Sequence, residues 1–114
     1  ARASRRMSAR RIPAWFVCGG KFHDIDYARL EILKLLAEHD AIRTRISEDY
    51  SDVDGIAASD FLVTYTVDVV PDEGRAARLR DYVAGGRRWL ALHGTNSVLR
   101  LNGKRWEAPR EYPT

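Results

Sequence analysis

The hydrophobic and polar positions divide the chain into short apolar runs that alternate with longer amphipathic segments. Residues 14–18 form a continuous apolar run followed by two glycines, which is typical of a strand covered on both faces. Residues 61–65 and 89–92 are runs of the same kind. Between about residues 25 and 39, the apolar positions form a wide stripe along one face of a helix. The pattern therefore predicts strands separated by helices.

Residues 41–47 show a different pattern, in which apolar and charged positions alternate. One face would carry Ile42, Thr44 and Ile46, and the other face Arg43 and Arg45. This alternation predicts a half-exposed strand at the edge of a sheet. The polar residues 48–55 that follow are interpreted as a turn-rich connection.

A further helix is predicted to open at Pro71, Asp72 and Glu73. Proline is tolerated in a first helical turn, and acidic residues suit the positive end of the helix dipole. The face of this helix that packs on the sheet is predicted to carry Ala76, Leu79 and Val83. Gly85 and Gly86 can end the helix in the left-handed conformation.

Strands that alternate with helices imply parallel pairing through right-handed crossovers. We therefore expect an α/β fold with a three-layer, flavodoxin-like parallel sheet in the strand order 2-1-3-4. Ligands of such sheets bind outside the carboxyl ends of the strands, where the strand order reverses. Residues 19–24, 66–68 and 93–97 should converge there.

The segment after residue 101 contains no apolar run that could supply a fifth strand or a closing helix. The predicted sheet is thus incomplete at its C-terminal side, and its last strand would expose apolar area or a bare edge. We expect either a fragment or a partner chain, such as a second copy in a homo-oligomer, that completes the sheet.

The composition narrows the class of protein. The chain has 114 residues, 45% of them hydrophobic and 31% charged, which suits one globular domain without a membrane span. Much of the net charge of +3 comes from arginines in residues 1–12, which we interpret as a basic, disordered arm before a domain over residues 13–114. We expect no nucleic-acid or membrane partner. The single cysteine fits a cytoplasmic location.

Two histidines follow predicted strands and are the candidates for chemistry. His23 and His93 would both lie at the crevice, where an imidazole can act as general acid, as general base or as a metal ligand. Asp24 could orient an imidazole, although capping of the first helix is the favoured reading. A divalent metal such as zinc could use the two histidines, but their spacing does not specify such a site.

Glycines and small polar residues surround these histidines. Gly19, Gly20 and Gly94 would let the backbone approach a ligand, or would serve only the geometry of the turns. Thr95 and Asn96 could bind a hydroxyl-rich ligand or cap a following helix. Both readings stay open for these residues.

Several common uses of this fold lack their motifs here. No Gly-x-Gly-x-x-Gly or Walker sequence follows the first strand, and the loop there lacks the hydroxyl groups of a flavin phosphate site. We therefore expect no nucleotide or flavin cofactor. A glutaminase needs a cysteine on a strand-to-helix turn, whereas Cys18 lies at the end of the first strand. Glutaminase activity is disfavoured, and Cys18 is interpreted as a core residue.

Three short segments carry a resemblance to a known family: GGKFHD at 19–24, YVAGG at 82–86 and LALHG at 90–94. They resemble the ThuA-like (trehalose utilization) family of the class I glutamine amidotransferase-like superfamily, and the chain looks like its N-terminal half. The resemblance spans most of residues 14–97. It implies a flavodoxin-like fold and a carbohydrate-metabolism enzyme that acts on a sugar or sugar derivative. His23, Asp24 and His93 would carry its acid/base or metal-assisted chemistry. The alternative is a non-catalytic, glutamine amidotransferase-like module for binding or assembly.

Overall fold

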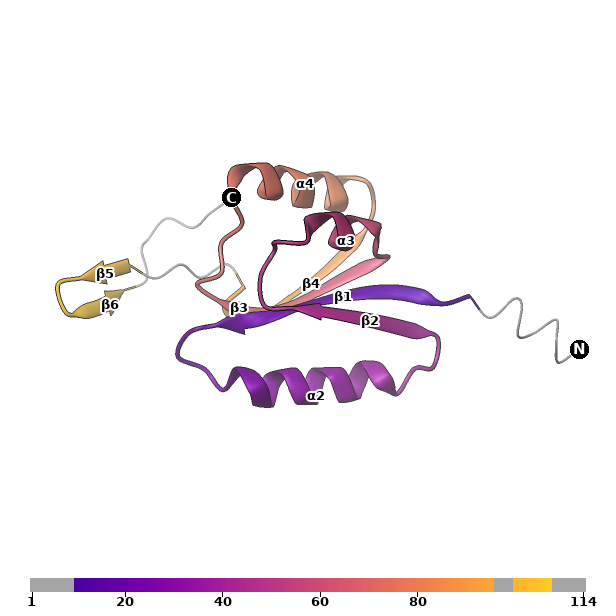
Figure 1. The fold of residues 1–114 in the computed structure, drawn as a ribbon, viewed down its shortest axis with the longest axis horizontal. Helices are drawn as coiled ribbons and strands as arrows, with labels where there is room; N and C mark the ends of the chain where they lie inside the picture. Colours follow the sequence, from indigo (N-terminus) through magenta and orange to yellow (C-terminus); the bar gives the residue numbers. More distant parts are fainter. Residues whose placement is uncertain (1–9, 96–99, 108–114) are drawn as a thin grey trace, which may run out of the picture.

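A four-stranded parallel sheet forms the centre of the computed structural model, which describes residues 10–95 and 100–107. One helix covers one side of the sheet and two helices cover the other (Figure 1). The elements in chain order are β1 (Ile12–Gly20), α2 (Ile25–Ala37), β2 (Ile42–Ser47), α3 (Val53–Ala58), β3 (Phe61–Val67), α4 (Glu73–Ala84), β4 (Arg88–Leu92), β5 (Arg100–Asn102) and β6 (Arg105–Glu107).

The strand order β2-β1-β3-β4 confirms the α/β fold and the order 2-1-3-4 predicted from the sequence. β1 is an inner strand and pairs in parallel with β2 on one side and β3 on the other. β2 and β4 are the outer strands. This arrangement is consistent with a flavodoxin-like fold. Among the described residues, no helix has both the length and the apolar character that crossing a membrane would require.

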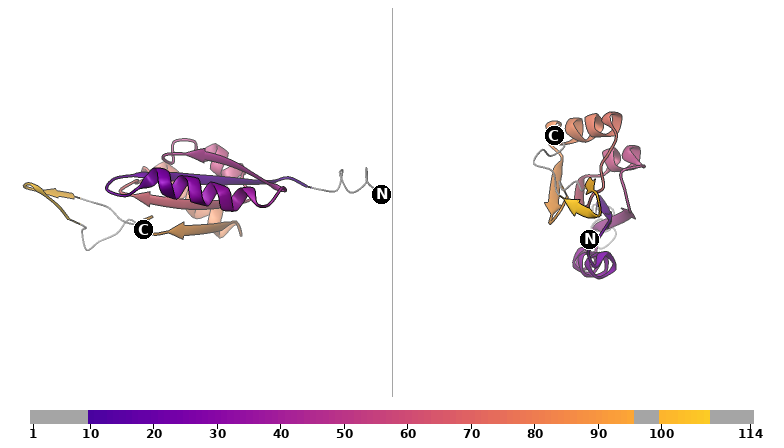
Figure 2. Two further views of the ribbon diagram at one scale, coloured as in Figure 1. Left: turned by 90° about the horizontal axis from the view of Figure 1, so that it is seen from below. Right: turned by 90° about the vertical axis from the view of Figure 1, so that its left-hand side faces the viewer.

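Alternation along β1 separates two cores, one on each side of the sheet. Figure 2 shows α2 on one side of the sheet and α3 and α4 on the other. Trp15 packs in the cluster that contains Ile56 of α3 and Leu79 of α4, and Phe16 packs in the cluster that α2 contacts. The core on the α3 and α4 side contains Trp15, Val17, Tyr50, Ile56, Leu62, Leu79 and Tyr82. The cluster of buried residues on the α2 side is smaller and contains Phe16, Cys18 and Val63, with partly buried residues such as Ile32 and Leu33 packed against it. The larger cluster of buried residues therefore lies on the side of α3 and α4.

The helix α3 was not predicted, since the pattern indicates a turn-rich connection over residues 48–55 and the helix begins within it at Val53. Asp52 caps α3, since its side chain accepts a hydrogen bond from the backbone N–H of Gly55. Ile56 points into the core and is fully buried. A helix of six residues is too short to show a helical period, so the hydrophobic pattern carried no signal for it.

The buried face of α4 differs from the prediction at one position. Leu79 and Tyr82 are the buried residues, whereas Val83 is 46% exposed. Tyr82 reaches the core because its hydroxyl has polar partners there, a feature that apolar spacing does not reveal. The predicted glycine end is confirmed at Gly86, whose φ is +98°.

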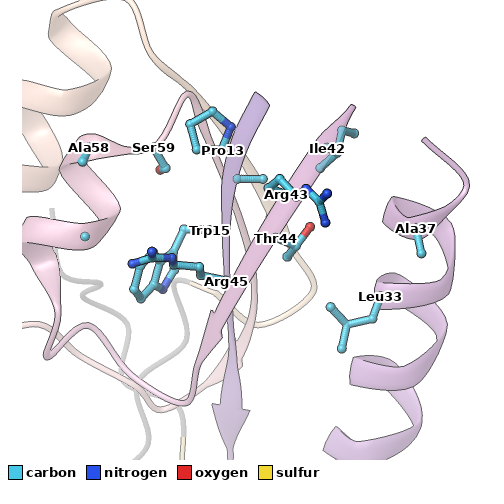
Figure 3. Close-up of a pocket in the computed structure, with 12 residues that line it drawn as sticks. Pro13, Trp15, Leu33, Ala37, Ile42, Arg43, Thr44, Arg45, Ala58 and Ser59 are labelled. Atoms are coloured by element: carbon cyan, nitrogen blue, oxygen red, sulfur yellow. The ribbon is translucent and has the colours of Figure 1, made fainter. Parts of the chain in front are cut away.

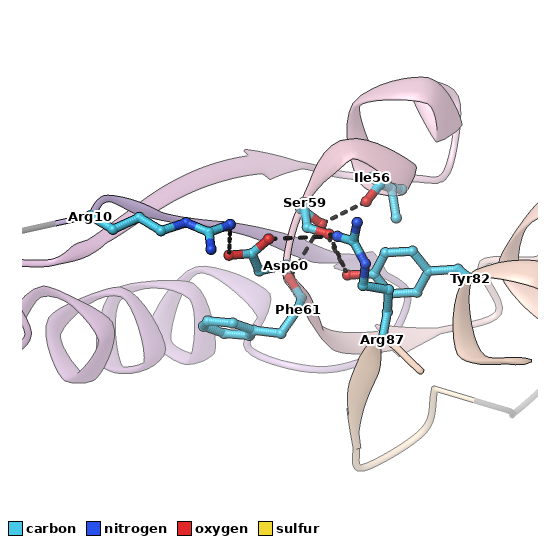
Figure 4. A network of polar contacts seen from close by, with 7 residues as sticks. All are labelled: Arg10, Ile56, Ser59, Asp60, Phe61, Tyr82 and Arg87. Atoms are coloured by element: carbon cyan, nitrogen blue, oxygen red, sulfur yellow. Dashed lines mark hydrogen bonds and ion pairs between the residues drawn. The ribbon is translucent and has the colours of Figure 1, made fainter. Parts of the chain in front are cut away.

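Polar contacts around Ser59 join α3, β3 and α4 (Figure 4). The Ser59 hydroxyl donates to the carbonyl of Ile56 at 2.6 Å, and the Tyr82 hydroxyl donates to the carbonyl of Ser59 at 3.1 Å. Arg87 also donates to the carbonyl of Ser59. The carboxylate of Asp60 lies 3.6 Å from both Arg10 and Arg87. Burial raises the pKa of Tyr82.

The segment after β4 contains one antiparallel pair, β5 with β6, which forms a sheet of its own. Within the described residues the parallel sheet therefore has four strands. Leu90 on the outer strand β4 is 58% exposed, as expected for a strand with apolar residues at an open edge.

Candidate functional site

The carboxyl ends of three neighbouring strands carry unusual backbone conformations. Phe22, Asp68 and His93 follow β1, β3 and β4, and each has a positive φ between 55° and 66°. A residue with a side chain enters this left-handed region at a cost of about 1–2 kcal/mol. Such residues cluster at functional sites, where the surrounding structure holds them in place. The described residues other than glycine that have a positive φ all lie at the predicted crevice.

His23 and His93 meet at this crevice. Their Nε2 atoms are 2.7 Å apart, and their rings make an edge-to-face contact with centroids 4.4 Å apart. Both residues are exposed. The predicted convergence of the loops after β1 and β4 is therefore confirmed for these two side chains, which lie 70 residues apart in the sequence.

Tyr65 on β3 supports the imidazole of His93. The two rings are stacked, with centroids 5.4 Å apart and an angle of 11° between their planes. Tyr65 is the register partner of Leu92, the residue before His93. The stacking therefore fixes the plane of the His93 ring over the third strand.

A chain of hydrogen bonds holds the turn that carries His93. The indole N–H of Trp89 donates to the hydroxyl of Thr64 at 2.9 Å, and this hydroxyl lies 2.8 Å from that of Thr95. The Thr95 hydroxyl in turn donates to the carbonyl of Leu92 at 2.9 Å. Because each hydroxyl can accept one hydrogen bond and donate another, all the hydrogen bonds in this series can form at the same time. Together they fix residues 92–95.

Two glycines bring the loop after β1 close to the neighbouring strands. A Cβ atom at Gly19 would lie 2.4 Å from the carbonyl oxygen of Glu48, and one at Gly20 would lie 2.1 Å from that of Val67. Gly20 also has a φ of +121°. Neither position can accept a side chain, so both glycines have a structural role that positions His23.

An ion pair ties the same loop to the end of β3. The Lys21 ammonium lies 3.1 Å from the carboxylate of Asp68, whose side chain is only 13% exposed. The backbone N–H of Lys21 also donates to the carbonyl of Val67 at 3.3 Å. These contacts join the first and third strands beside the histidines.

The remaining candidate residues have more local roles. The Asp24 carboxylate accepts a hydrogen bond from the backbone N–H of Tyr27 at 3.0 Å, which confirms the favoured capping role. The Thr95 hydroxyl is directed into the protein, as described above. Gly94 is buried in the turn after β4. Asn96 lies outside the described residues.

Cys18 is fully buried, and its thiol lies 3.6 Å from the carbonyl oxygen of Ile25. Burial raises the pKa of this thiol, and the nearby Arg29 only partly opposes the effect. A thiol held in its neutral form is a poor nucleophile. This location agrees with the interpretation of Cys18 as a core residue.

The histidine pair can exchange a single proton. A contact of 2.7 Å between two imidazole nitrogens requires one N–H and one lone pair, so the two Nε2 atoms share one hydrogen. Catalytic zinc sites use three protein ligands. Within residues 10–95 and 100–107, no group of three or more histidine, cysteine, aspartate or glutamate side chains is placed to hold a metal ion.

The sequence analysis did not single out Tyr65 or the Lys21–Asp68 pair. Both depend on register: Gly20 lies beside Val67, and Leu92 lies beside Tyr65. The charged residues placed directly after the ends of β1 and β3 are a signal that could have found the ion pair, whereas no local signal marks Tyr65. The chain matches no protein-family model, no curated protein and no solved structure.

Proposed function

We propose that this chain is a ThuA-like domain of carbohydrate metabolism that acts on a sugar or sugar derivative by proton transfer at His23 and His93. The observation that carries the proposal is the 2.7 Å contact between the two Nε2 atoms at the carboxyl ends of β1 and β4. Ligands of doubly wound sheets bind at this place. The short motifs at 19–24, 82–86 and 90–94 supply the link to sugars.

The chemistry follows from how the pair holds its proton. In the free protein one Nε2 donates and the other accepts. A sugar hydroxyl that enters between the rings donates its proton to the accepting Nε2, while the donating Nε2 gives its proton to a second oxygen of the same sugar. One imidazole then serves as base and the other as acid, so a proton can pass through the substrate without a net change of charge.

His93 is the better positioned partner. Its ring is stacked on Tyr65, and the Thr64–Thr95 contact fixes its turn. His23 lies on a loop that glycines and the Lys21–Asp68 pair bring into place. Acid/base chemistry is favoured over metal-assisted chemistry because the described residues offer two candidate ligands and no third.

The test uses trehalose and a panel of other sugars, incubated with the protein in D₂O and followed by proton NMR. Conversion of the sugar should fall about 100-fold or more in His23→Ala and in His93→Ala. His39→Ala is the matched control, because His39 is exposed beyond the far end of α2. It should leave the rate unchanged.

Two results would overturn the proposal. Sugar binding that persists in both variants, without conversion by the wild type, would favour a non-catalytic binding or assembly module. Stoichiometric zinc found by elemental analysis in the wild type, and lost in both variants, would replace proton transfer with metal-assisted chemistry. Circular dichroism of each variant checks that the fold is kept.

A further inference from the structure

A large hollow lies at the other end of the molecule, along the outer strand β2. Its volume is about 710 Å³, and residues from both sides of the sheet line it. Leu33 and Ala37 of α2 border it on one side of β2, and Ala58 of α3 and Ser59 border it on the other (Figure 3). The hollow therefore follows the edge of the sheet and reaches around both faces of its outer strand.

The two faces of β2 differ in chemistry. Ile42 and Thr44 pair with Ile12 and Ala14, which lie on the same face of β1 as Phe16, and so they face α2. Arg43 and Arg45 face the opposite side, where Arg45 lies beside its register partner Trp15. The hollow is thus apolar toward α2 and cationic toward α3.

Both arginines are available to a partner. Their guanidinium groups make no hydrogen bond or ion pair with any residue in 10–95 or 100–107, and both residues are exposed. Several other arginines in the described part of the chain are paired, as Arg78 is with Asp54 at 2.7 Å. The outer side of β2 also presents backbone N–H and C=O groups that no neighbouring strand in the described sheet satisfies.

We propose that the edge of β2 binds an extended peptide segment as an added strand, with apolar side chains toward α2 and carboxylates toward Arg43 and Arg45. Main-chain hydrogen bonds to β2 would supply affinity, and alternate side chains would supply specificity. The six residues of β2 span about 20 Å, enough for a segment of five or six residues.

Charge argues against a second copy of this chain as the occupant. If β2 paired with β2 of another copy, arginines of both strands would lie on the same face of the joint sheet. Like charges opposite one another across a strand pair are destabilising. The same arginines that protect the edge from self-pairing therefore select an acidic partner.

The experiment uses the peptide Thr-Val-Glu-Val-Glu-Val-Thr-amide with fluorescein on its N-terminal amine, titrated with the full chain and followed by fluorescence anisotropy. The analogue with lysine in place of glutamate should bind at least about tenfold more weakly. An analogue that is N-methylated at alternate residues, on the edge that faces β2, should also lose binding, because it cannot form the strand ladder.

Variants test the two arginines. Arg45→Glu should weaken binding of the glutamate peptide about tenfold or more. The double variant Arg43→Glu/Arg45→Glu should instead bind the lysine peptide more tightly than the glutamate peptide. Arg88→Glu is the matched control, since Arg88 is an exposed arginine on the other outer strand. It should change binding less than twofold.

Three outcomes would overturn the inference. Equal binding of the N-methylated peptide would show an anion site rather than an added strand. If the glutamate peptide does not bind at millimolar protein, the edge of β2 contacts only water. Self-association in sedimentation that an excess of the glutamate peptide reverses would identify a second copy as the occupant. Because His23 and His93 lie at the opposite end of the strands, none of these results bears on the proposed sugar chemistry.

Discussion

The two sides of the sheet differ in how much each helix contributes to the core. The helix α2 has thirteen residues and none of them is buried, whereas the six-residue helix α3 buries Ile56 completely. Leu30 and Leu35 of α2 are 56% and 58% exposed. The length of a helix is therefore a poor guide to its contribution, which depends on the apolar surface that it removes from water.

The largest expected effect compares Ile56→Ala with Leu35→Ala. Removing the buried side chain of Ile56 leaves a cavity between α3 and the sheet and should cost about 2–5 kcal/mol of unfolding free energy. Leu35→Ala, on the exposed surface of α2, should change it by about 0.5 kcal/mol or less. Urea denaturation measures both. A similar loss in the two variants would show that α2 contributes as much core as α3.

A pair of glycine substitutions compares the packing around α3 with the packing around the first turn of α4. A Cβ at Gly55 would lie 2.5 Å from Cζ3 of Trp15, whose side chain is buried and has little room to move. Gly55→Ala should therefore destabilise the protein by about 1–3 kcal/mol. At Gly74 in the first turn of α4 the nearest atom is 3.8 Å away, so Gly74→Ala should stabilise it by about 0.4–1 kcal/mol.

A double mutant identifies the cause of the Gly55 effect. In Trp15→Phe the smaller ring leaves space for the new methyl group, so Gly55→Ala should cost less in that background than in the wild type. Additive losses in urea denaturation would instead assign the effect to the backbone of α3.

These contrasts also show what sequence patterns can predict. The sheet order was predictable because runs such as residues 14–18 and the alternation in β2 have a clear period. The position of His23 and His93 followed from topology alone. The contribution of α3 was not predictable, since it depends on the contact between Gly55 and Trp15, which are forty residues apart. Local patterns carry no information on such contacts.

The contacts that shape the site were hidden for a related reason. Tyr65 lies under His93 only because β3 and β4 pair in one particular register. Phe22 adopts a left-handed conformation that sequence would assign to a glycine. Both features arise from how the strands are aligned, and the alignment is set by the whole sheet rather than by the residues nearby.

The smallest effect concerns pH on the better packed side of the sheet. Tyr50 is 3% exposed and packs edge-to-face on Trp89, and burial raises its pKa above the ordinary value. A group with a raised pKa contributes stability in full below its unfolded pKa, which is about 10 for tyrosine, and loses it as the pH rises through the folded value. In Tyr50→Phe, the urea concentration at the unfolding midpoint should therefore fall less steeply with pH above pH 10 than in the wild type.

The control is Tyr27→Phe, at a tyrosine that is 63% exposed on α2, and it should keep the wild-type slope. Equal slopes in all three proteins would mean that water reaches Tyr50, and that the α3 and α4 side is less tightly packed than its burial indicates.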